Sequence, residues 1–279
     1  LTIVKAVTGS TSTMNFCNGD LDLSGVTFDG ANNTSEMGIG LSGYCATLGS
    51  GGTLGDILLD DVVIKDFNNG AGGGYVGLYM TGNPTSTTMN NSSILNSGSN
   101  GANLSGDVIS LTNINVSNNG SEGLNIFNDA DITVSNSNIS ANNGIGLRIS
   151  GSNGSTVISD TTIDGNSNSG NGAGVSVSYF SGSDGGSLTI ENSTISNNTT
   201  TDGDGAGIYI FNDHQDIAVS IKQSTISGNE TTGTVNGYGA GVFFENYNSK
   251  SAISFTTPPS ISNSTITDNT SHSVGGGLH

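Results

Sequence analysis

The sequence predicts one all-β domain, a right-handed parallel β-helix (a solenoid) of about nine rungs. Three columns of residues that recur down the chain predict this fold. An apolar anchor residue recurs nine times, as Phe28, Ile64, Ile94, Val116, Ile139, Ile163, Ile195, Ile226 and Ile266. Five positions before each anchor stands a second apolar residue, namely Leu23, Leu59, Met89, Leu111, Val134, Ile158, Ile190, Ile221 or Ile261. Three positions before each anchor stands a glycine or a polar residue, namely Gly25, Asp61, Asn91, Asn113, Asn136, Asp160, Asn192, Gln223 or Asn263.

The repeating unit is clearest at residues 187–212. Residues 188–190 alternate apolar and polar side chains, which is the spacing of a strand. Asn192 is expected to make a corner, and Ile195 lies on a second short strand. After another corner and a polar loop, residues 205–210 (GAGIYI) form the third predicted strand. Short segments, β-branched residues and frequent Gly and Asn exclude helices.

The third strand also recurs in every unit. Its inward apolar residue is expected at Leu41, Leu78, Leu104, Leu124, Leu147, Val175, Ile208, Val242 and Leu278, and a glycine precedes eight of these nine. The outward residues that follow are Ser42, Tyr79, Ser105, Asn125, Arg148, Ser176, Tyr209, Phe243 and His279. The glycines either relieve a corner where φ is positive or leave a flat strip beside exposed rings. In the second interpretation Tyr79, Arg148, Tyr209 and Phe243 form a binding surface for a sugar or another rod.

A fourth column contains only asparagine. It stands three positions after the last six anchors, as Asn119, Asn142, Asn166, Asn198, Asn229 and Asn269. A buried carboxamide is costly when it is unpaired. Stacked at the rung spacing, each amide can donate to one neighbour and accept from the other. We therefore expect a hydrogen-bonded ladder that holds the corners and has no catalytic role.

The variation between units is confined to the loops. Successive anchors are 22 to 40 residues apart, and the extra length falls in segments such as 45–55, 178–187 and 245–258. A coil that wraps once per unit tolerates this variation because loops can bulge outwards. We expect an N-terminal strand or cap segment at 1–20 and the β-helix at 21–279.

The chain is strongly acidic, with 23 acidic residues, five Lys and Arg residues and a net charge of −18. It offers no basic stripe for nucleic acid and no attraction to an anionic lipid surface. No apolar run is long enough to span a membrane. Because the sequence starts at Leu1 without a signal peptide, we expect a processed chain or a fragment. Few lysines and arginines give few sites to trypsin-like proteases, which suits an extracellular protein.

Three segments carry a recognisable repeat. They are STITDNTSHSVGGGL at 264–278, STISNNTTTDGDGAGI at 193–208 and STISGNETTGTVNGYGAGV at 224–242. This pattern resembles the STIxxN…GGGI repeat of polymorphic outer-membrane proteins and similar right-handed β-helix surface proteins of bacteria. The resemblance covers roughly 85–279 well and 20–84 loosely. It implies a secreted or surface-displayed β-helix that is often adhesive or structural.

We expect no enzymatic activity. A polysaccharide lyase of this fold class needs carboxylates beside a basic side chain, and the single arginine, Arg148, has Asn125 and Ser176 as its expected neighbours one rung away. A hydrolase needs two carboxylates on one face. Asp60 and Asp61 are adjacent in a strand and therefore point to opposite faces.

Four acidic residues are candidate calcium ligands, and no other cofactor is expected. Asp202 and Asp204 precede the third strand of one rung, and Asp213 and Asp216 follow it. Carboxylate oxygens are the ligands that calcium prefers. The alternative is that these residues are solvated acidic turns.

Cys17 and Cys45 are predicted to form a disulfide. They occupy similar turns of neighbouring rungs, and one rung spacing suits the bond. Such a bond indicates an oxidising compartment.

Two classes of function follow. The first is a non-enzymatic extracellular structural protein, a rod that acts as an adhesive surface stalk or as the subunit of an end-to-end filament. Its expected partners are further copies joined through the rod ends, or surface glycans on host or neighbouring cells. Segment 1–4 is strand-like, and the chain stops inside a third strand at His279, so one end is expected to cover the other. The second is a carbohydrate-binding or polysaccharide-degrading β-helix protein, which the absence of tryptophan disfavours.

Overall fold

The computed structural model describes residues 2–5, 14–16, 18–30, 37–41, 44–45, 50–51, 54–67, 76–80, 82–127, 131–151, 154–179, 186–213, 217–233, 237–247 and 258–279. All the regular elements in these ranges are β-strands. Within the same ranges, no helix could cross a membrane.

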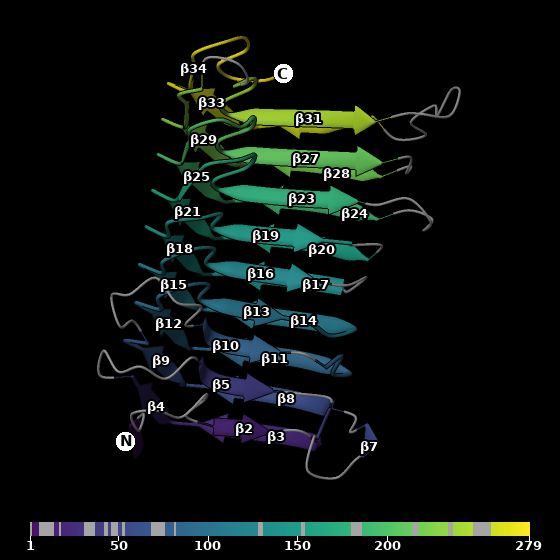
Figure 1. Cartoon of the computed structure of the whole chain (residues 1–279). Helices are drawn as coiled ribbons and strands as arrows, with labels where there is room; N and C mark the ends of the chain where they lie inside the picture. Colours follow the sequence, from purple (N-terminus) through teal and green to yellow (C-terminus); the bar gives the residue numbers. More distant parts are fainter. Residues whose placement is uncertain are drawn as a thin grey trace.

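Three long parallel sheets form the walls of a coil whose rungs stack from the purple N-terminal end to the yellow C-terminal end (Figure 1). Sheet A contains β1 (Thr2–Lys5), β4 (Val26–Asp29), β9 (Val63–Lys65), β12 (Ser93–Leu95), β15 (Asn115–Ser117), β18 (Asn138–Ser140), β21 (Thr162–Asp164), β25 (Thr194–Ser196), β29 (Thr225–Ser227) and β33 (Thr265–Thr267). Sheet B contains β2 (Met14–Phe16), β5 (Met37–Leu41), β10 (Val76–Met80), β13 (Ala102–Leu104), β16 (Leu124–Phe127), β19 (Leu147–Ser150), β23 (Val175–Tyr179), β27 (Ile208–Asp213) and β31 (Val242–Tyr247). Sheet C contains β3 (Gly19–Ser24), β8 (Leu54–Asp60), β11 (Ser86–Asn90), β14 (Val108–Thr112), β17 (Asp131–Ser135), β20 (Ser155–Ser159), β24 (Ser187–Glu191), β28 (Ala218–Lys222) and β32 (Ser260–Ser262).

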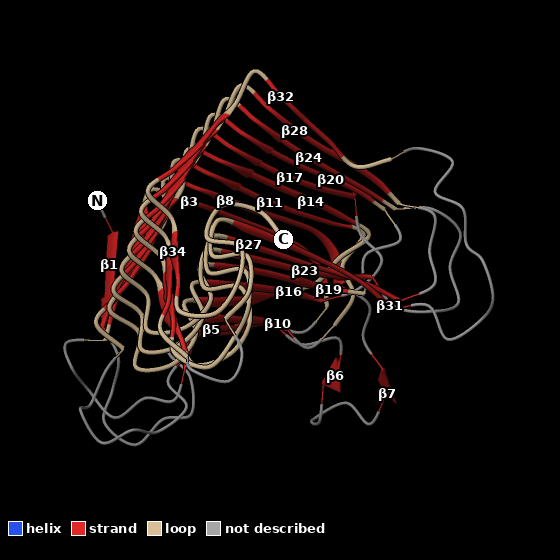
Figure 2. Ribbon diagram, turned by 90° about the horizontal axis from the view of Figure 1, so that it is seen from above, coloured by secondary structure: helices blue, strands red, loops and turns tan. Residues whose placement is uncertain are grey.

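Two smaller sheets complete the described structure. Sheet E is a parallel sheet of β22 (Ser167–Asn168), β26 (Thr199–Thr200), β30 (Glu230–Thr231) and β34 (Thr270–Ser271). An antiparallel pair, β6 (Tyr44–Cys45) and β7 (Ser50–Gly51), lies beside the coil. Seen from above, the chain of each rung passes from sheet C to sheet A and then to sheet B (Figure 2). The predicted parallel β-helix is confirmed.

The predicted 1–20 segment contributes strands to two of these walls. β1 pairs in parallel with β4 in sheet A, and β2 pairs in parallel with β5 in sheet B. Both strands are therefore paired within the stack.

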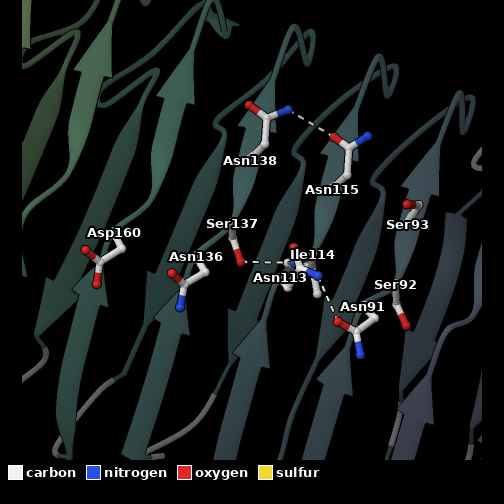
Figure 3. A pocket seen from close by; sticks show the side chains of 10 residues that line it. All are labelled: Asn91, Ser92, Ser93, Asn113, Ile114, Asn115, Asn136, Ser137, Asn138 and Asp160. Atoms are coloured by element: carbon white, nitrogen blue, oxygen red, sulfur yellow. Dashed lines mark hydrogen bonds between the residues drawn. The ribbon is translucent and has the colours of Figure 1, made fainter.

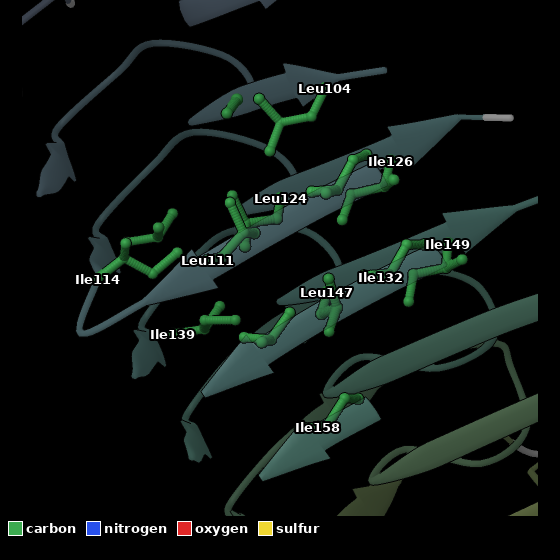
Figure 4. Close-up of a cluster of buried hydrophobic side chains, with 14 of the residues drawn as sticks. Leu104, Leu111, Ile114, Leu124, Ile126, Ile132, Ile139, Leu147, Ile149 and Ile158 are labelled. Carbon is green, nitrogen blue, oxygen red and sulfur yellow. The ribbon is translucent and has the colours of Figure 1, made fainter. Parts of the chain in front are cut away.

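The two apolar columns run in register through sheets A and C. Each anchor is the direct partner of the next, from Phe28 to Ile266. The second column pairs in the same way from Leu23 to Ile261. Between the end rungs these side chains are fully buried and pack against the inward side chains of sheet B (Figure 4). Each such residue stabilises the fold by roughly 2–5 kcal/mol over alanine.

Two columns of residues with positive φ turn the chain between the sheets. The corner from sheet C to sheet A falls on the predicted column, where Asn91, Asn136 and Asn192 each have a φ of 49°. The second corner follows sheet A at Asp66, Asn96, Asn118, Ala141, Gly165, Asn197, Gly228 and Asp268. Glycine, asparagine and aspartate tolerate this left-handed conformation better than other residues, which explains their abundance at both corners.

The six asparagines after the anchors form one continuous column, the buried asparagine column, in which Asn119 to Asn229 are buried and Asn269, in the last rung, is half-buried. Each Nδ2 group from Asn119 to Asn229 donates to the Oδ1 atom of the asparagine in the next rung, over 2.8 to 3.0 Å. The same Oδ1 atom accepts the backbone N–H of the asparagine before it. The column begins above Phe67 and Ser97, which occupy the equivalent positions in earlier rungs and are also buried. The amides therefore occupy this part of the core at little cost, because their polar atoms are paired.

A second hydrogen-bonded column, the corner hydroxyl column, supports the first corner. It consists of Ser92, Ser137, Thr161, Ser193, Ser224 and Ser264, whose hydroxyls donate to the carbonyl oxygen two residues earlier over 2.6 to 2.9 Å. Each hydroxyl also accepts a backbone N–H from the preceding rung, over 3.0 to 3.3 Å. Ile114 interrupts this column. These bonds fix the backbone of the corner.

Six glycines that precede inward residues of sheet B pack against the buried asparagine column, namely Gly101, Gly123, Gly146, Gly174, Gly207 and Gly241. A Cβ atom on Gly207 would lie 2.9 Å from the Nδ2 atom of Asn229 and 2.5 Å from the carbonyl oxygen of Gly241. Positive φ occurs two residues earlier, at Gly172, Gly205, Gly239 and Gly275. The interpretation that positive φ selects the glycines of the predicted column is therefore wrong. Close approach of neighbouring rungs selects them.

The predicted register of sheet B is wrong in two rungs. Leu124 pairs with Ala102 rather than Leu104, so Asn103 rather than Ser105 lies in the outward column. The reason is that Ala102 follows its anchor by eight residues, as Leu124 does in the next rung. Near the N-terminal end, Leu78 pairs with Ile39 rather than Leu41. Gly40 therefore replaces Ser42 in the outward column.

Candidate functional site

The outward column of sheet B brings the four residues of the predicted binding surface into one line. Tyr79, Asn103, Asn125, Arg148, Ser176, Tyr209 and Phe243 are successive Cα partners. Only Tyr209 and Phe243 are in adjacent rungs. Tyr79 and Arg148 are separated from them and from each other by polar residues, so the four side chains do not form one cluster.

The aromatic half of this column is a stack of rings. The Tyr209 and Phe243 rings are 5.9 Å apart between centroids and parallel within 1°, and the Phe243 and His279 rings are 5.4 Å apart. Tyr238, from the turn before β31, stacks on both Phe243 and His279. Because the rings stack on one another, this arrangement stabilises neighbouring rungs.

Two carboxylates, those of Glu245 and Asp204, bond to residues of the stack. The Tyr209 hydroxyl donates to Glu245, and burial together with this bond and the Glu245 charge raises the pKa of Tyr209 above its usual range. The Oδ1 atom of Asp204 accepts the backbone N–H groups of Gly237 and Tyr238 over 2.9 and 2.8 Å. Both carboxylates therefore link one rung to the next.

The polar half of the column contains an ion pair that the sequence did not reveal. Arg148 has Asn125 and Ser176 as strand partners, as expected. Its Nη1 atom, however, lies 3.2 Å from the Oε1 atom of Glu122, which belongs to the turn of the preceding rung. Periodicity predicts no register for turn residues, so Glu122 could not be placed from it. The guanidinium of Arg148 is therefore paired with the carboxylate of Glu122.

Of the four predicted calcium ligands, the structure describes Asp202, Asp204 and Asp213. Asp202 and Asp204 precede β27, and Asp213 ends it, about 17 Å along the strand from its first residue, Ile208. Asp216 lies outside the described residues. Among the residues that are described, no group of three or more His, Cys, Asp and Glu side chains could hold a metal ion. Calcium binding by these loops stays a prediction.

The predicted disulfide also falls outside what the structure describes. Cys17 lies outside the described residues, and of Cys45 only the backbone, in β6, is described. The bond between them stays a prediction.

A hollow along the first corner is the site that the sequence analysis did not anticipate. This corner groove has a volume of about 500 Å³ and is lined by Asn91, Ser92, Ser93, Asn113, Ile114, Asn115, Asn136, Ser137, Asn138 and Asp160 (Figure 3). The sequence assigned part of this set to the corner column. It gave no sign that the neighbouring residues of sheet A would line the same hollow.

Hydrogen bonds order the side chains along this groove. The Nδ2 group of Asn113 donates to the Oδ1 atom of Asn91 over 2.8 Å, and Asn138 donates to Asn115 over 3.0 Å (Figure 3). The groove therefore carries two parallel rows of carboxamides, and the groups in each row are spaced by the rungs.

Comparison with known proteins supports the fold. The model of the family described as "Right handed beta helix region" matches residues 76–249, which is more than half of the chain. No curated protein and no solved structure matches the sequence. With its stacked parallel sheets and this match, the chain belongs to the right-handed β-helix family.

Proposed function

We propose that this chain is a non-enzymatic structural protein of the cell exterior, a β-helical rod that serves as an adhesive surface stalk or as a filament subunit. The observation that carries the proposal is the direction of its polar interactions. In the part of the chain that the structure describes, the buried asparagines and the corner hydroxyls bond to partners one rung away.

Two charged pairs also join neighbouring rungs, as the buried asparagine column and the corner hydroxyl column do. The Nζ atom of Lys222 lies 2.7 Å from Glu191, and these two residues are strand partners in sheet C. Lys65 and Asp29 are strand partners in sheet A, and the Nζ atom of Lys65 lies 3.4 Å from the Oδ2 atom of Asp29. Such pairs across neighbouring strands strengthen the stack.

This construction suits a rod. Each rung contacts mainly its two neighbours, so stability grows with the number of rungs. Nine rungs stacked about 4.8 Å apart give a core roughly 40 Å long. The net charge of −18 keeps such a rod soluble.

A turnover assay tests the non-enzymatic role. The chain is incubated with neutral and acidic polysaccharides, and new reducing ends and unsaturated products are measured over time. We expect no release above a protein-free control. Steady release that Arg148→Ala abolishes and Lys222→Ala leaves intact would contradict the proposal and support polysaccharide degradation, the alternative function.

Sedimentation tests the filament form of the proposal. The end rungs expose apolar side chains, with Ile3 52%, Val274 53% and Leu278 55% exposed. We expect the sedimentation coefficient to rise with protein concentration as copies join through these rungs. A monomer at every concentration would rule out the filament and leave the stalk.

A further inference from the structure

The corner groove has hydrogen-bonding capacity that the protein does not use. A carboxamide offers two donor hydrogens and two acceptor lone pairs. The bonds that join Asn138 to Asn115 and Ser140, and those that join Asn91 to Asn113 and Asp60, satisfy only part of this capacity. Asn136 and Asp160, at the C-terminal end of the groove, make no side-chain hydrogen bond in the described part of the structure.

Hydrogen bonds and corner backbone geometry define the shape of the groove. Its floor includes Ser137, whose hydroxyl donates to the carbonyl oxygen of Ser135 over 2.6 Å and accepts the backbone N–H of Ile114 over 3.2 Å. The outer wall includes Asn113 and Asn136, whose backbones are fixed in the left-handed conformation with φ of 54° and 49°. A preorganised site loses little entropy on binding.

The chemistry of the groove selects a neutral, hydroxyl-rich ligand. Asp160 is its only ionisable side chain, and the whole chain carries a net charge of −18, so an anionic polymer is repelled. Carboxamides both donate and accept, as sugar hydroxyls do. An extended peptide would find side-chain amides here but no free strand edge with which to pair.

The spacing of the groove selects a linear polymer. From Asn91 to Asp160 the lining residues occupy four consecutive rungs, which are about 4.8 Å apart, so the amide rows extend for roughly 14 Å. A sugar chain with equatorial linkages advances by about one rung spacing per residue. Each sugar laid along the axis would therefore lie beside the amides of one rung, and alternate sugars would present the same hydroxyls.

We propose that the corner groove binds a linear, uncharged polysaccharide that lies parallel to the axis of the β-helix. This inference adds a ligand to the rod and does not depend on the rod's structural role. The groove lies at the corner between sheets C and A, away from the outward face of sheet B.

Calorimetric titration of the full chain with cellohexaose, xylohexaose and mannohexaose tests the proposal. We expect at least one of them to bind. Among shorter oligomers of the same sugar, the affinity should rise with chain length up to about four sugars. Hexagalacturonate, which carries a charge on every sugar, should bind at least tenfold more weakly.

Variants identify the site. Asn136→Gly combined with Asn138→Ala removes amides from both rows while permitting positive φ at the corner, and should weaken binding at least tenfold. Asn192→Gly combined with Thr194→Ala makes the matched pair of changes at the same corner outside the groove and should leave binding unchanged. Thermal melting of each variant confirms that it is folded. Absence of binding by all three neutral hexasaccharides, stronger binding of hexagalacturonate, or equal binding by both variants would overturn the proposal without affecting the evidence for the rod.

Discussion

Asn198 shows how one side chain can serve as part of a polar core. Its Oδ1 atom accepts the Nδ2 and backbone N–H groups of Asn166, each over 3.0 Å. Its Nδ2 group donates to Asn229 over 3.0 Å and to the carbonyl oxygen of Ile163 over 3.1 Å. No polar atom of the amide is left unpaired, which is why asparagine can be buried here.

Replacing Asn198 with alanine should lower the free energy of unfolding by about 3 kcal/mol, because it leaves buried donors and acceptors of its neighbours unpaired. Asn138→Ala removes a half-buried surface amide and should cost about 0.5 kcal/mol or less. Urea denaturation measures both. Equal losses would contradict the structural role of the buried asparagine column.

Asn198→Asp should add a pH dependence. A buried carboxylate lacks the donors that Asn229 and Ile163 need, so its pKa in the folded state should rise. A group with a raised folded pKa binds its proton more tightly in the folded state, so stability falls as pH rises. The free energy of unfolding of this variant should therefore be lowest at neutral pH. It should approach that of Asn198→Ala as the pH falls below about 4. Stability curves measured at several pH values check this.

Two tyrosines should ionise late in alkali. Burial raises the pKa of Tyr179, and burial together with Glu245 raises that of Tyr209. The folded state then keeps protons that the unfolded state releases, so stability should fall as pH rises past about 10. Tyr209→Phe should remove part of the late-ionising absorbance of tyrosinate and flatten this decline. An unchanged titration curve would contradict the burial of its hydroxyl.

At the scale of the elements, the corners set the shape of each rung. The second corner contains Ala141 at a φ of 54°, in a column otherwise made of glycine, asparagine and aspartate. Alanine is strained in this conformation.

Ala141→Gly should therefore stabilise the protein by up to about 1 kcal/mol, since the relief of strain exceeds the added freedom of the unfolded chain. Ala206, which is fully buried and lacks positive φ, is the matched control. Ala206→Gly should destabilise by about 0.5–1 kcal/mol. Denaturation midpoints measure both changes, and destabilisation by Ala141→Gly would show that the corner is not strained.

The sequence predicted those elements in which one residue type repeats at a fixed distance from the anchor. The anchor column, the second apolar column and the first corner all keep their predicted register, because a one-residue slip would move apolar side chains from core to solvent. The prediction at Leu104 was wrong because the inward positions on either side of Asn103, Ala102 and Leu104, are both apolar. The smaller residue, Ala102, is the one that pairs with Leu124.

The candidate sites were harder to predict because they combine residues from different columns. The groove joins Asn113 of the corner with Asn115 of sheet A, and the ion pair joins Arg148 with Glu122 of a turn. Periodicity identifies residues that lie above one another along the axis. It does not show which columns face each other across a corner.

Across the molecule, interactions run from rung to rung. Each buried asparagine and each corner hydroxyl depends on the rung beside it. Such a nearly one-dimensional structure should lose rungs one after another when force is applied to its ends.

Single-molecule force spectroscopy on the full chain, pulled through its two ends, tests this claim most directly. Successive anchors are 22 to 40 residues apart. Release of one rung should therefore lengthen the chain by about 75 to 140 Å, in a series of separate steps. Asn198→Ala should lower the force needed to release the rungs on either side of it. One abrupt event that releases the whole chain, with the same force in the variant, would contradict the account.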